Sequence, residues 1–239
     1  MKWLTRLEID SDTARREKVF DSYAWHKKLW ECFPGRPDDA RDFMTRIDPL
    51  EGGFRAWILS VQKPVCPSWY AGEDFSIKQI SSSFLAHRYY AFDLKVNPVK
   101  AIVQYDENGQ PLLQANGRRM RGKRVPLVNP DDLREWLVRK GHVRCRDQKT
   151  RQDVPGGFRL VESRPLEISP MSRDLSKIKR KDENGNYIGG YHKGCHGGVQ
   201  FLGTLEVTDR EAFIKTYREG IGSAKGFGFG LLLLAPINL

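Results

Sequence analysis

The sequence has 239 residues, enough for one large domain or two small ones, and carries a formal net charge of +10 at pH 7. Residues 231–237 form its longest apolar run, which is far too short to span a bilayer. Residues 1–10 alternate polar and apolar side chains without the apolar core of a signal peptide. The four cysteines lie far apart and form no CxxC motif, which favours reduced thiols over a disulfide framework. These features predict a cytoplasmic protein that is not held in a membrane.

The positive charge is concentrated in the second part of the chain. Residues 1–95 carry 15 basic and 14 acidic side chains, whereas residues 96–239 carry 25 basic and 16 acidic ones. A basic region beside a near-neutral one is typical of proteins that bind a polyanion, and we expect nucleic acid as the partner. A basic surface without a partner is the alternative that charge alone leaves open.

The first part of the chain predicts a unit of strand, helix, strand, strand, short helix and strand. Residues 2–9 alternate polar and apolar side chains, which is the period of a half-buried strand. Residues 19–33 place apolar side chains at helical spacing, with Trp25 and Leu29 on the buried face. A polar connection is expected at 10–16, strands are expected at 42–48, 53–62 and 75–80, and the short helix is expected before the last strand.

The second part repeats this order with longer connections. Asp106-Glu107-Asn108-Gly109 signals a hairpin turn, because Asn-Gly accepts the positive φ that such a turn needs. The same tetrapeptide recurs at 182–185, where we expect a second hairpin. Strands are expected at 90–97, 158–168, 199–207 and 227–237.

Two helices separate these strands. Asn129 can cap a helix that closes at Gly141, and Thr208 with Glu211 forms a capping box for a helix that ends before Gly220. The element order in both parts suits a ferredoxin-like fold used twice, although no sequence repeat supports the duplication. We predict an α+β protein with two tandem ferredoxin-like (RRM-like) domains, residues 1–87 and 88–239.

One helix edge carries candidate catalytic residues. Tyr23, His26 and Trp30 lie at i, i+3 and i+7, beside the buried face of the helix expected at 19–33. A histidine next to a tyrosine on an accessible helix edge can move protons near neutral pH. A partly buried, hydrogen-bonded histidine without a catalytic role is the alternative, and for an isolated histidine it is the more common one.

Three clusters of basic residues lie in the second part of the chain. Five of the seven residues at 118–124 are cationic, and further clusters lie at 144–151 and 177–181. Such runs suit contacts to phosphates, and arginine can also read guanine edges, whereas solvated loops are the alternative. The residues expected to contact nucleic acid in these clusters and in the strand at 158–168 are Arg118, Arg119, Arg121, Lys123, Arg124, Arg144, Arg146, Arg159, Lys177, Lys179 and Arg180.

A glycine-rich segment at 220–230 follows an expected helix and precedes an expected strand. A dinucleotide-binding loop runs from strand to helix, so this order excludes that motif. Its glycines would let a phosphodiester backbone approach main-chain N–H groups, and its lysine adds positive charge. We expect Gly222, Lys225, Gly226 and Gly228 to lie at the nucleic acid, with a plain turn between packed elements as the alternative.

Metal chemistry has weak support. His192-x-x-Cys195-His196 resembles half of a metal site, but no second half lies at the usual spacing. A glycine-rich loop with polar residues is the more common interpretation. The sequence also holds no paired acidic motif for two-metal phosphoryl chemistry. We therefore expect no metal site and no cofactor, with a metal nuclease that uses these three residues as a remote alternative.

Several motifs together resemble the CasE family of CRISPR repeat endoribonucleases. The likeness runs over nearly the whole chain and is most specific at its two ends. Residues 10–18, 145–157 and 174–197 match no pattern of the family. The motifs are Tyr-Ala-Trp-His-Lys-Lys-Leu-Trp at 23–30, Phe-Pro-Gly-Arg-Pro at 33–37, Ala-Arg-Asp-Phe at 40–43, Leu-Lys-Val-Asn-Pro at 94–98, Arg-Val-Pro-Leu at 124–127 and the glycine-rich ending at 220–236.

The resemblance implies two ferredoxin-like domains, a CRISPR repeat RNA hairpin as the partner in precursor and mature crRNA, and assembly with the other Cascade subunits. It places the catalytic histidine on His26, the active-site tyrosine on Tyr23 and the glycine-rich loop on 220–230. Cleavage would need no metal, and attack by the ribose 2′-OH would leave a 2′,3′-cyclic phosphate and a 5′-OH. A non-catalytic RNA-binding scaffold subunit of the same fold is the main alternative.

Overall fold

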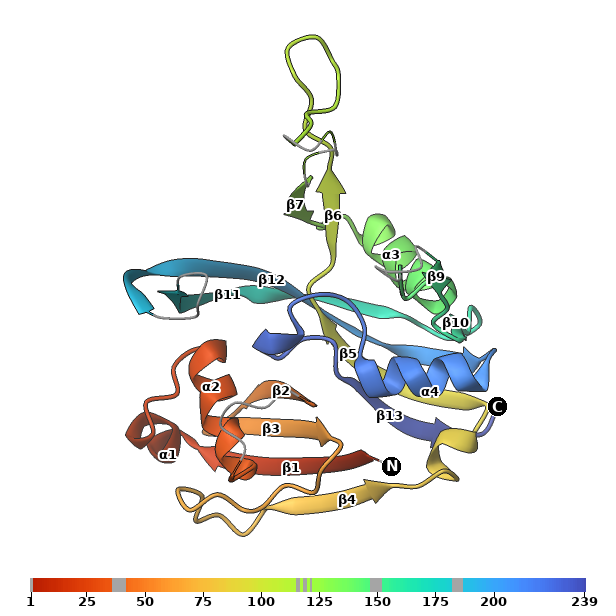
Figure 1. Cartoon of the computed structure of the whole chain (residues 1–239). Helices are drawn as coiled ribbons and strands as arrows, with labels where there is room; N and C mark the ends of the chain where they lie inside the picture. Colours follow the sequence, from red (N-terminus) through yellow and green to blue (C-terminus); the bar gives the residue numbers. More distant parts are fainter. Residues whose placement is uncertain are drawn as a thin grey trace.

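The computed structural model describes residues 2–35, 42–114, 117, 120, 122–146, 152–181 and 187–239. Only the main chain is described for residues 172–181 and 191–196 and for Lys123, Arg146 and Tyr187. This part of the chain forms two main antiparallel sheets, one below the other in Figure 1. No helix within it is long and apolar enough to cross a membrane.

Both sheets have the strand order of a ferredoxin-like fold. In each, the first strand lies between the last two, and the strand that follows the first in sequence takes the edge beside the next-to-last one, so two tandem ferredoxin-like domains are confirmed. The expected boundary after residue 87 stays a prediction. The first sheet, ordered β2-β3-β1-β4, contains β1 (Lys2–Asp10), β2 (Phe43–Leu50), β3 (Gly53–Ser60) and β4 (Ser76–Ile80). The second, ordered β10-β12-β5-β13 with β11 also paired to β12, contains β5 (Tyr89–Val96), β10 (Phe158–Leu160), β11 (Glu167–Lys181), β12 (Tyr187–Val207) and β13 (Leu232–Ile237).

The first domain departs from the prediction between β1 and β2. Helices α1 (Ser11–Arg16), α2 (Ser22–Leu29) and η1 (Trp30–Cys32) replace the polar connection and the single helix expected there. The Asp10 carboxylate accepts a hydrogen bond from the Thr13 N–H at 2.7 Å and so begins α1. Lys18 then takes a positive φ of 56°, which ends the helical path before Asp21 begins α2. The predicted polar connection was therefore wrong, whereas the predicted helix is confirmed with a later start and a short 3-10 turn at its end.

Helix α2 is held by burial on one side and by charge on the other. Trp25 and Leu29 are buried in a core with Leu7 and Ile58 of the first sheet. Burying a large apolar side chain contributes about 1.5–3 kcal/mol, so these two residues fix which edge of α2 faces outward. Lys28 also lies 2.8 Å from a Glu17 carboxylate oxygen and 3.0 Å from one of Glu31, which ties α2 to the segment after α1.

The connection from β3 to β4 also differs from the prediction. Residues 61–75 contain no helix, and the only short helical turn near β4 is η2 (Phe84–Ala86), which follows that strand. Tyr70 shows how the connection is held, because its ring is buried and its hydroxyl donates to the Glu8 carbonyl at 2.9 Å. The predicted short helix before β4 was therefore wrong.

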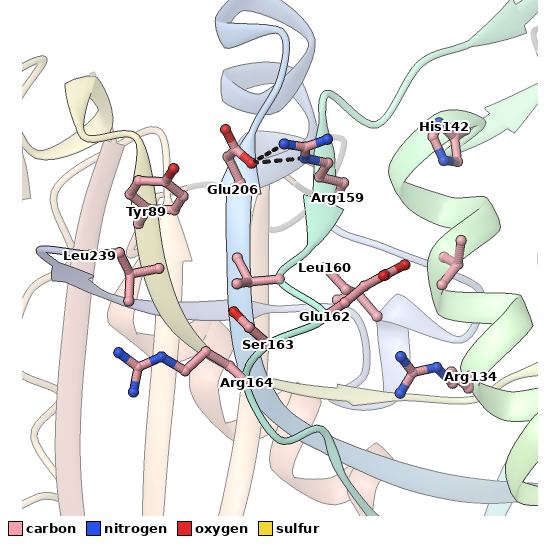
Figure 2. Close-up of a pocket in the computed structure, with 12 residues that line it drawn as sticks. Tyr89, Arg134, His142, Arg159, Leu160, Glu162, Ser163, Arg164, Glu206 and Leu239 are labelled. Atoms are coloured by element: carbon pink, nitrogen blue, oxygen red, sulfur yellow. Dashed lines mark hydrogen bonds and ion pairs between the residues drawn. The ribbon is translucent and has the colours of Figure 1, made fainter.

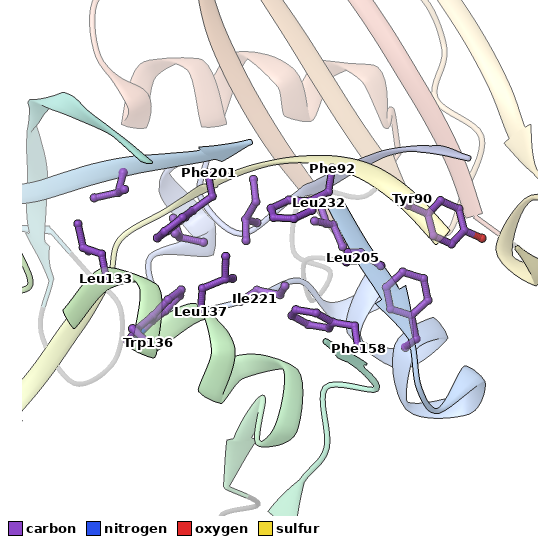
Figure 3. Packing of buried hydrophobic residues seen from close by; sticks show 14 of the residues in the cluster. Tyr90, Phe92, Leu133, Trp136, Leu137, Phe158, Phe201, Leu205, Ile221 and Leu232 are labelled. Atoms are coloured by element: carbon purple, nitrogen blue, oxygen red, sulfur yellow. The ribbon is translucent and has the colours of Figure 1, made fainter. Parts of the chain in front are cut away.

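Helices α3 (Pro130–His142) and α4 (Arg210–Glu219) cover the second sheet with one continuous core (Figure 3). Leu133 and Trp136 of α3 meet Phe201 of β12 there, and the Trp136 and Phe201 rings stack at 6.4 Å between centroids. Asn129 caps α3 as predicted. The capping box predicted for α4 was wrong, because the Asp209 carboxylate, not Thr208, accepts from the Ala212 N–H at 3.0 Å.

Between β5 and α3 the chain leaves the body as a narrow arm, which points upward in Figure 1. Strands β6 (Val99–Ile102) and β7 (Lys123–Pro126) form its base. The predicted hairpin turn is confirmed, since the Asp106 carboxylate accepts from the Asn108 and Gln110 N–H groups and Gly109 has a φ of 74°. The second predicted turn, at 182–185, lies outside the described residues, although β11 and β12 on either side of it pair antiparallel. A further small hairpin, β8 (Cys145–Arg146) with β9 (Asp153–Val154), follows α3.

Four charged residues join the two domains where β2 meets β5. The Arg46 side chain is only 2% exposed and reaches both carboxylates, with Nε 2.9 Å from Asp48 and a terminal nitrogen 2.6 Å from Asp93. The Lys95 ammonium contacts the Asp48 carboxylate from the other side. The neutral side chain of Gln200 also donates a hydrogen bond to the second Asp93 carboxylate oxygen, at 2.9 Å. We call Arg46, Asp48, Asp93 and Lys95 the interdomain network.

The network keeps Asp48 ionised. Burial raises the pKa of this carboxyl, but the Arg46 charge and the Lys95 hydrogen bond outweigh burial, so the net pKa lies below its ordinary value. A lowered folded-state pKa means that the carboxylate stabilises the fold above the pKa of the unfolded chain. That contribution is lost as the pH falls through the lower pKa of the folded state.

We expect the R46M substitution to lower the free energy of unfolding by about 3–5 kcal/mol, because it leaves two carboxylates without their shared cation. The matched variant R15M removes an exposed pair with Asp12 and should cost at most about 1 kcal/mol. Urea unfolding at neutral pH measures both changes. Equal, small losses in the two variants would show that the network does not hold the domains together.

Candidate active site

Tyr23 and His26 lie on the edge of α2 beside its buried face, and Trp30 continues this edge as the first residue of η1. All three are partly exposed, whereas Trp25 and Leu29 on the neighbouring face are buried. The side chain of Lys27 lies over the Tyr23 ring at 5.8 Å. The structure therefore presents the predicted tyrosine–histidine pair beside solvent on a helix whose rotation is fixed by its core side chains.

The imidazole of His26 is held by aromatic neighbours. The Trp30 indole N–H donates to His26 Nε2 at 3.3 Å, and the Phe43 ring lies 6.2 Å away between centroids. Phe43 also packs edge-on against Trp30 at 4.8 Å and stacks on Phe33 at 4.6 Å. An Nε2 that accepts a hydrogen bond carries a lone pair, so neutral His26 has its proton on Nδ1. The single lone pair of Nε2 is thus occupied by the Trp30 N–H, which must give way before Nε2 can receive a proton.

The glycine-rich loop at 220–230 brings the second domain to this edge. Its short helix η3 (Lys225–Phe227) packs against both α2 and β2. Gly222 and Gly228 each have a φ of 84°, a conformation that strongly favours glycine. The base of the loop closes through the Ile221 N–H, which donates to the Gly230 carbonyl at 3.0 Å. The predicted loop therefore lies beside the catalytic candidates.

Lys225 and Arg144 have structural partners in this loop region. The Lys225 ammonium donates to the Glu219 carbonyl at the end of α4, at 2.6 Å. Arg144 is only 4% exposed and pairs with the Glu219 carboxylate at 2.8 Å. Burial lowers the pKa of Lys225, and the nearby Arg144 charge lowers it further against the opposing effect of Glu219. Arg144 is thus not a solvated side chain, and its predicted contact with nucleic acid stays a prediction.

Apart from Arg159, the other predicted nucleic-acid contacts that the structure describes lie on three strands of the second domain. Lys123 and Arg124 lie on β7 at the base of the arm, and Arg124 is exposed. Arg118, Arg119 and Arg121 lie outside the described residues. Lys177, Lys179 and Arg180 are positions of β11, in the long hairpin with β12, and Arg146 is a position of β8.

The β11–β12 hairpin reaches the first domain. Helix α2 contacts β11, and Figure 1 shows the outer part of the hairpin above that helix. Leu175 pairs with Cys195 and Ile178 with His192 in its ladder, so the suggested half metal site lies on paired strand, not in a loop. The basic positions of β11 are therefore carried toward α2 by a continuous two-stranded element.

Arg159 lies away from this region. It lines a cavity of about 770 Å³ at the end of the second sheet where β5 begins (Figure 2). Its guanidinium pairs with the Glu206 carboxylate at 2.7 Å, and Arg88 pairs with the same carboxylate at 2.7 Å. The glycine-rich loop adjoins the other end of β5, where Asn97 bridges to Ser223. The structure does not bring Arg159 together with His26.

Two groups at the site carried no signal in the sequence. Phe43 begins β2, far from His26 in sequence, and only the antiparallel sheet places its ring against the imidazole. Phe227 reaches α2 through the loop, where it lines a cleft together with Ser22 and Trp25. The spacing of Tyr23, His26 and Trp30 did indicate their shared edge. Among the described residues, no group of three or more His, Cys, Asp or Glu side chains is arranged to hold a metal ion.

Residues 2–236 match the model of a protein family described as CRISPR associated protein. The chain therefore belongs to this family, and the predicted membership of the CasE family is confirmed. It is 31% identical over 222 residues to the CRISPR system Cascade subunit CasE of Escherichia coli (strain K12), covering 91% of this chain and 93% of that protein. It is 26% identical to the CRISPR-associated endoribonuclease Cse3 of Thermus thermophilus, covering 98% and 100%.

Solved structures agree with this assignment. The crystal structure of Cas6e from Escherichia coli K-12 superimposes with a TM-score of 0.62 at 25% identity, covering 98% of this chain and 100% of that one. A structure of the endoribonuclease Cse3 bound to a 19-nucleotide RNA gives a TM-score of 0.63 at 25% identity, covering 99% and 100%. The shared fold thus extends over both ferredoxin-like domains.

At a pH where His26 is neutral, we expect its proton on Nδ1, because Nε2 accepts from the Trp30 indole. Long-range proton–nitrogen NMR correlations distinguish the two tautomers. The W30F substitution removes the donor but keeps a ring against Phe43, so it should shift the population toward Nε2–H. A dominant Nε2–H tautomer in the unsubstituted protein would contradict the hydrogen bond.

Proposed function

We propose that the chain is an endoribonuclease that binds the hairpin of CRISPR repeat RNA and cleaves the precursor to mature crRNA as a Cascade subunit. The observation that carries the proposal is the edge of α2, where Tyr23 and His26 lie beside the glycine-rich loop of the second domain. The relatives support it, since one is named a Cascade subunit and another an endoribonuclease. A domain junction of this kind can place a strand of RNA against both domains at once.

The proposed reaction is attack by the ribose 2′-OH on the adjacent phosphorus, with departure of the 5′-oxygen. The nucleophile is already tethered beside the phosphorus, so holding it in line gains the advantage of an intramolecular reaction. Once the ribose displaces the Trp30 N–H from Nε2, His26 would take the 2′-OH proton there or, when protonated, give one to the leaving oxygen. Tyr23 would orient the ribose or donate to the phosphate, and no metal would be needed.

The hairpin stem would be held by the basic positions of the second domain. Double-stranded RNA is recognised mainly through its shape, phosphates and 2′-hydroxyls, and long basic elements suit that mode of contact. Strand β7 at the base of the arm and the β11–β12 hairpin both carry Lys and Arg positions. We assign the stem contacts to Arg124 and to the 118–123 and 177–180 segments, with main-chain contacts from Gly222, Gly226 and Gly228.

A non-catalytic scaffold subunit of the same fold is the alternative. It would use the same basic segments and the same loop, and it would differ only in having no chemistry at Tyr23 and His26. Cleavage of labelled hairpin RNA with and without EDTA separates the possibilities. Cutting in EDTA supports the proposed enzyme, no cutting in either condition supports the scaffold, and cutting only without EDTA supports a metal nuclease.

We expect H26A to slow single-turnover cleavage by about 100- to 10,000-fold, the usual contribution of a general acid–base group. Hairpin affinity should stay within about 3-fold, since the stem contacts lie on the other domain. The exposed His87 offers a matched control, because H87A removes an imidazole far from α2 and should change neither quantity. Wild-type cleavage rates in H26A would exclude His26 from the chemistry.

A single 2′-deoxy substitution, on the nucleotide just 5′ of the scissile phosphate, should abolish cleavage and leave binding intact. The hydroxyl is the proposed nucleophile but only a small part of a stem-wide contact surface. The measurement is product formation at saturating protein, after the affinity of the modified hairpin has been confirmed. Normal cleavage of the deoxy substrate would mean that water or another group attacks the phosphorus.

A further inference from the structure

A cleft of about 290 Å³ lies between the two domains, beside the N-terminal end of α2. Its walls come from α2 and the residue pair before it, from β2 and β3, from Met171 of β11 and from the glycine-rich loop. A concave site with flat apolar walls and few polar groups suits a small ring-shaped ligand. The aromatic rings that line it are Phe20, Trp25, Phe54, Phe227 and Phe229.

The polar groups of the cleft disfavour a phosphate. Lys95 supplies the one cation of the lining, but its ammonium already contacts the Asp48 carboxylate and donates to the Ile47 carbonyl at 3.3 Å. The Asp21 carboxylate also lines the cleft, where it accepts from the Ala24 N–H at 2.7 Å. A phosphate would meet a neutralised cation and the negative charge of Asp21, whereas an uncharged ring would meet neither penalty.

Phe20 is placed at this cleft with most of its ring in water. It is 75% exposed, although it lines the cleft together with the buried Trp25. The chain is fixed on both sides of it, since Val19 is buried in the core and Asp21 caps α2. An exposed aromatic ring on a fixed main chain is a ready stacking platform, because every nucleobase has a flat face.

The cleft adjoins the residues that we propose cleave RNA. Ser22 lines the cleft and directly precedes Tyr23, and Trp25 lines it and directly precedes His26. Helix η3 packs against α2 and supplies Phe227 to the same cleft. A strand of RNA whose scissile phosphate lies over α2 therefore passes the opening of the cleft within a short distance of the reacting atoms.

We propose that the cleft binds the base of one unpaired nucleotide that flanks the scissile phosphate, with Phe20 stacking on it. This rests on the proposed function, because the cleaved strand is what carries a base past the opening. Stacking of one base on an aromatic side chain is worth about 5- to 100-fold in affinity and tolerates any base. The cleft thus anchors the flank of the hairpin and helps hold the phosphate in line.

The test measures the affinity of a hairpin RNA with single-stranded flanks on both sides of the scissile phosphate, made uncleavable by one 2′-deoxy nucleotide. Matched RNAs replace each flanking nucleotide in turn by an abasic one. F20L should weaken binding of the intact RNA by about 5- to 100-fold, and F20W should restore it. At one of the abasic positions the missing base is the one that Phe20 contacts. The F20L variant and the unsubstituted protein should bind that abasic RNA with equal affinity. V65A, a change at an exposed apolar residue that does not line the cleft, should leave every affinity unchanged.

Each outcome decides between the two proposals. The base-binding cleft would be overturned if F20L lowered the affinity for the intact RNA and for every abasic RNA equally. It would also be overturned if F20L left the affinity for the intact RNA unchanged. The predicted pattern together with no cleavage of the all-ribose RNA would overturn the nuclease and keep the cleft as a binding site. Absence of any hairpin binding would overturn both.

Discussion

The charges that join β2 to β5 set the geometry on which the candidate site depends. Arg46 is buried between two carboxylates from different domains, Asp48 and Asp93, while Lys95 approaches Asp48 from the second domain. A buried ion pair is costly to form, but removing one partner is costlier still, so such a set favours one arrangement of the two sheets over its alternatives. Apolar packing between Leu59 and the end of α4 and β13 supports that arrangement without specifying it so closely.

The site is composite because each domain supplies an incomplete part of it. The first domain provides the helix with Tyr23 and His26, and the second provides the loop that faces it. Strand β5, which supplies Asp93 and Lys95 to the interdomain network, also anchors that loop. The Lys95 carbonyl accepts a hydrogen bond from the Gly230 N–H at 2.7 Å. A shift of the sheets would therefore move the loop relative to His26, and displacements of about 1 Å can cost about 100-fold in rate.

The sequence predicted elements whose signal is local and missed features that depend on distant residues. The alternation in β1 and β5 and the Asn129 cap were read correctly, because each depends on neighbours in the chain. The break at Lys18 was missed because a positive φ at a lysine has no local sequence signal. Arg144 was expected to contact nucleic acid, and its pairing with Glu219 had no local signal because Glu219 lies far along the chain. One signal was available and unused, since Arg-x-Asp at 46–48 and Asp-x-Lys at 93–95 place opposite charges on one face of each strand.

The single-turnover cleavage rate of R46M at saturating hairpin RNA tests most directly whether the fixed domain arrangement creates the active site. It is measured at a temperature and pH where circular dichroism shows the variant to be fully folded. If the network sets the position of the loop against His26, the rate falls by about 10- to 100-fold while hairpin affinity changes by less than about 3-fold. A folded R46M protein that cleaves at the wild-type rate would contradict this relation between the network and catalysis.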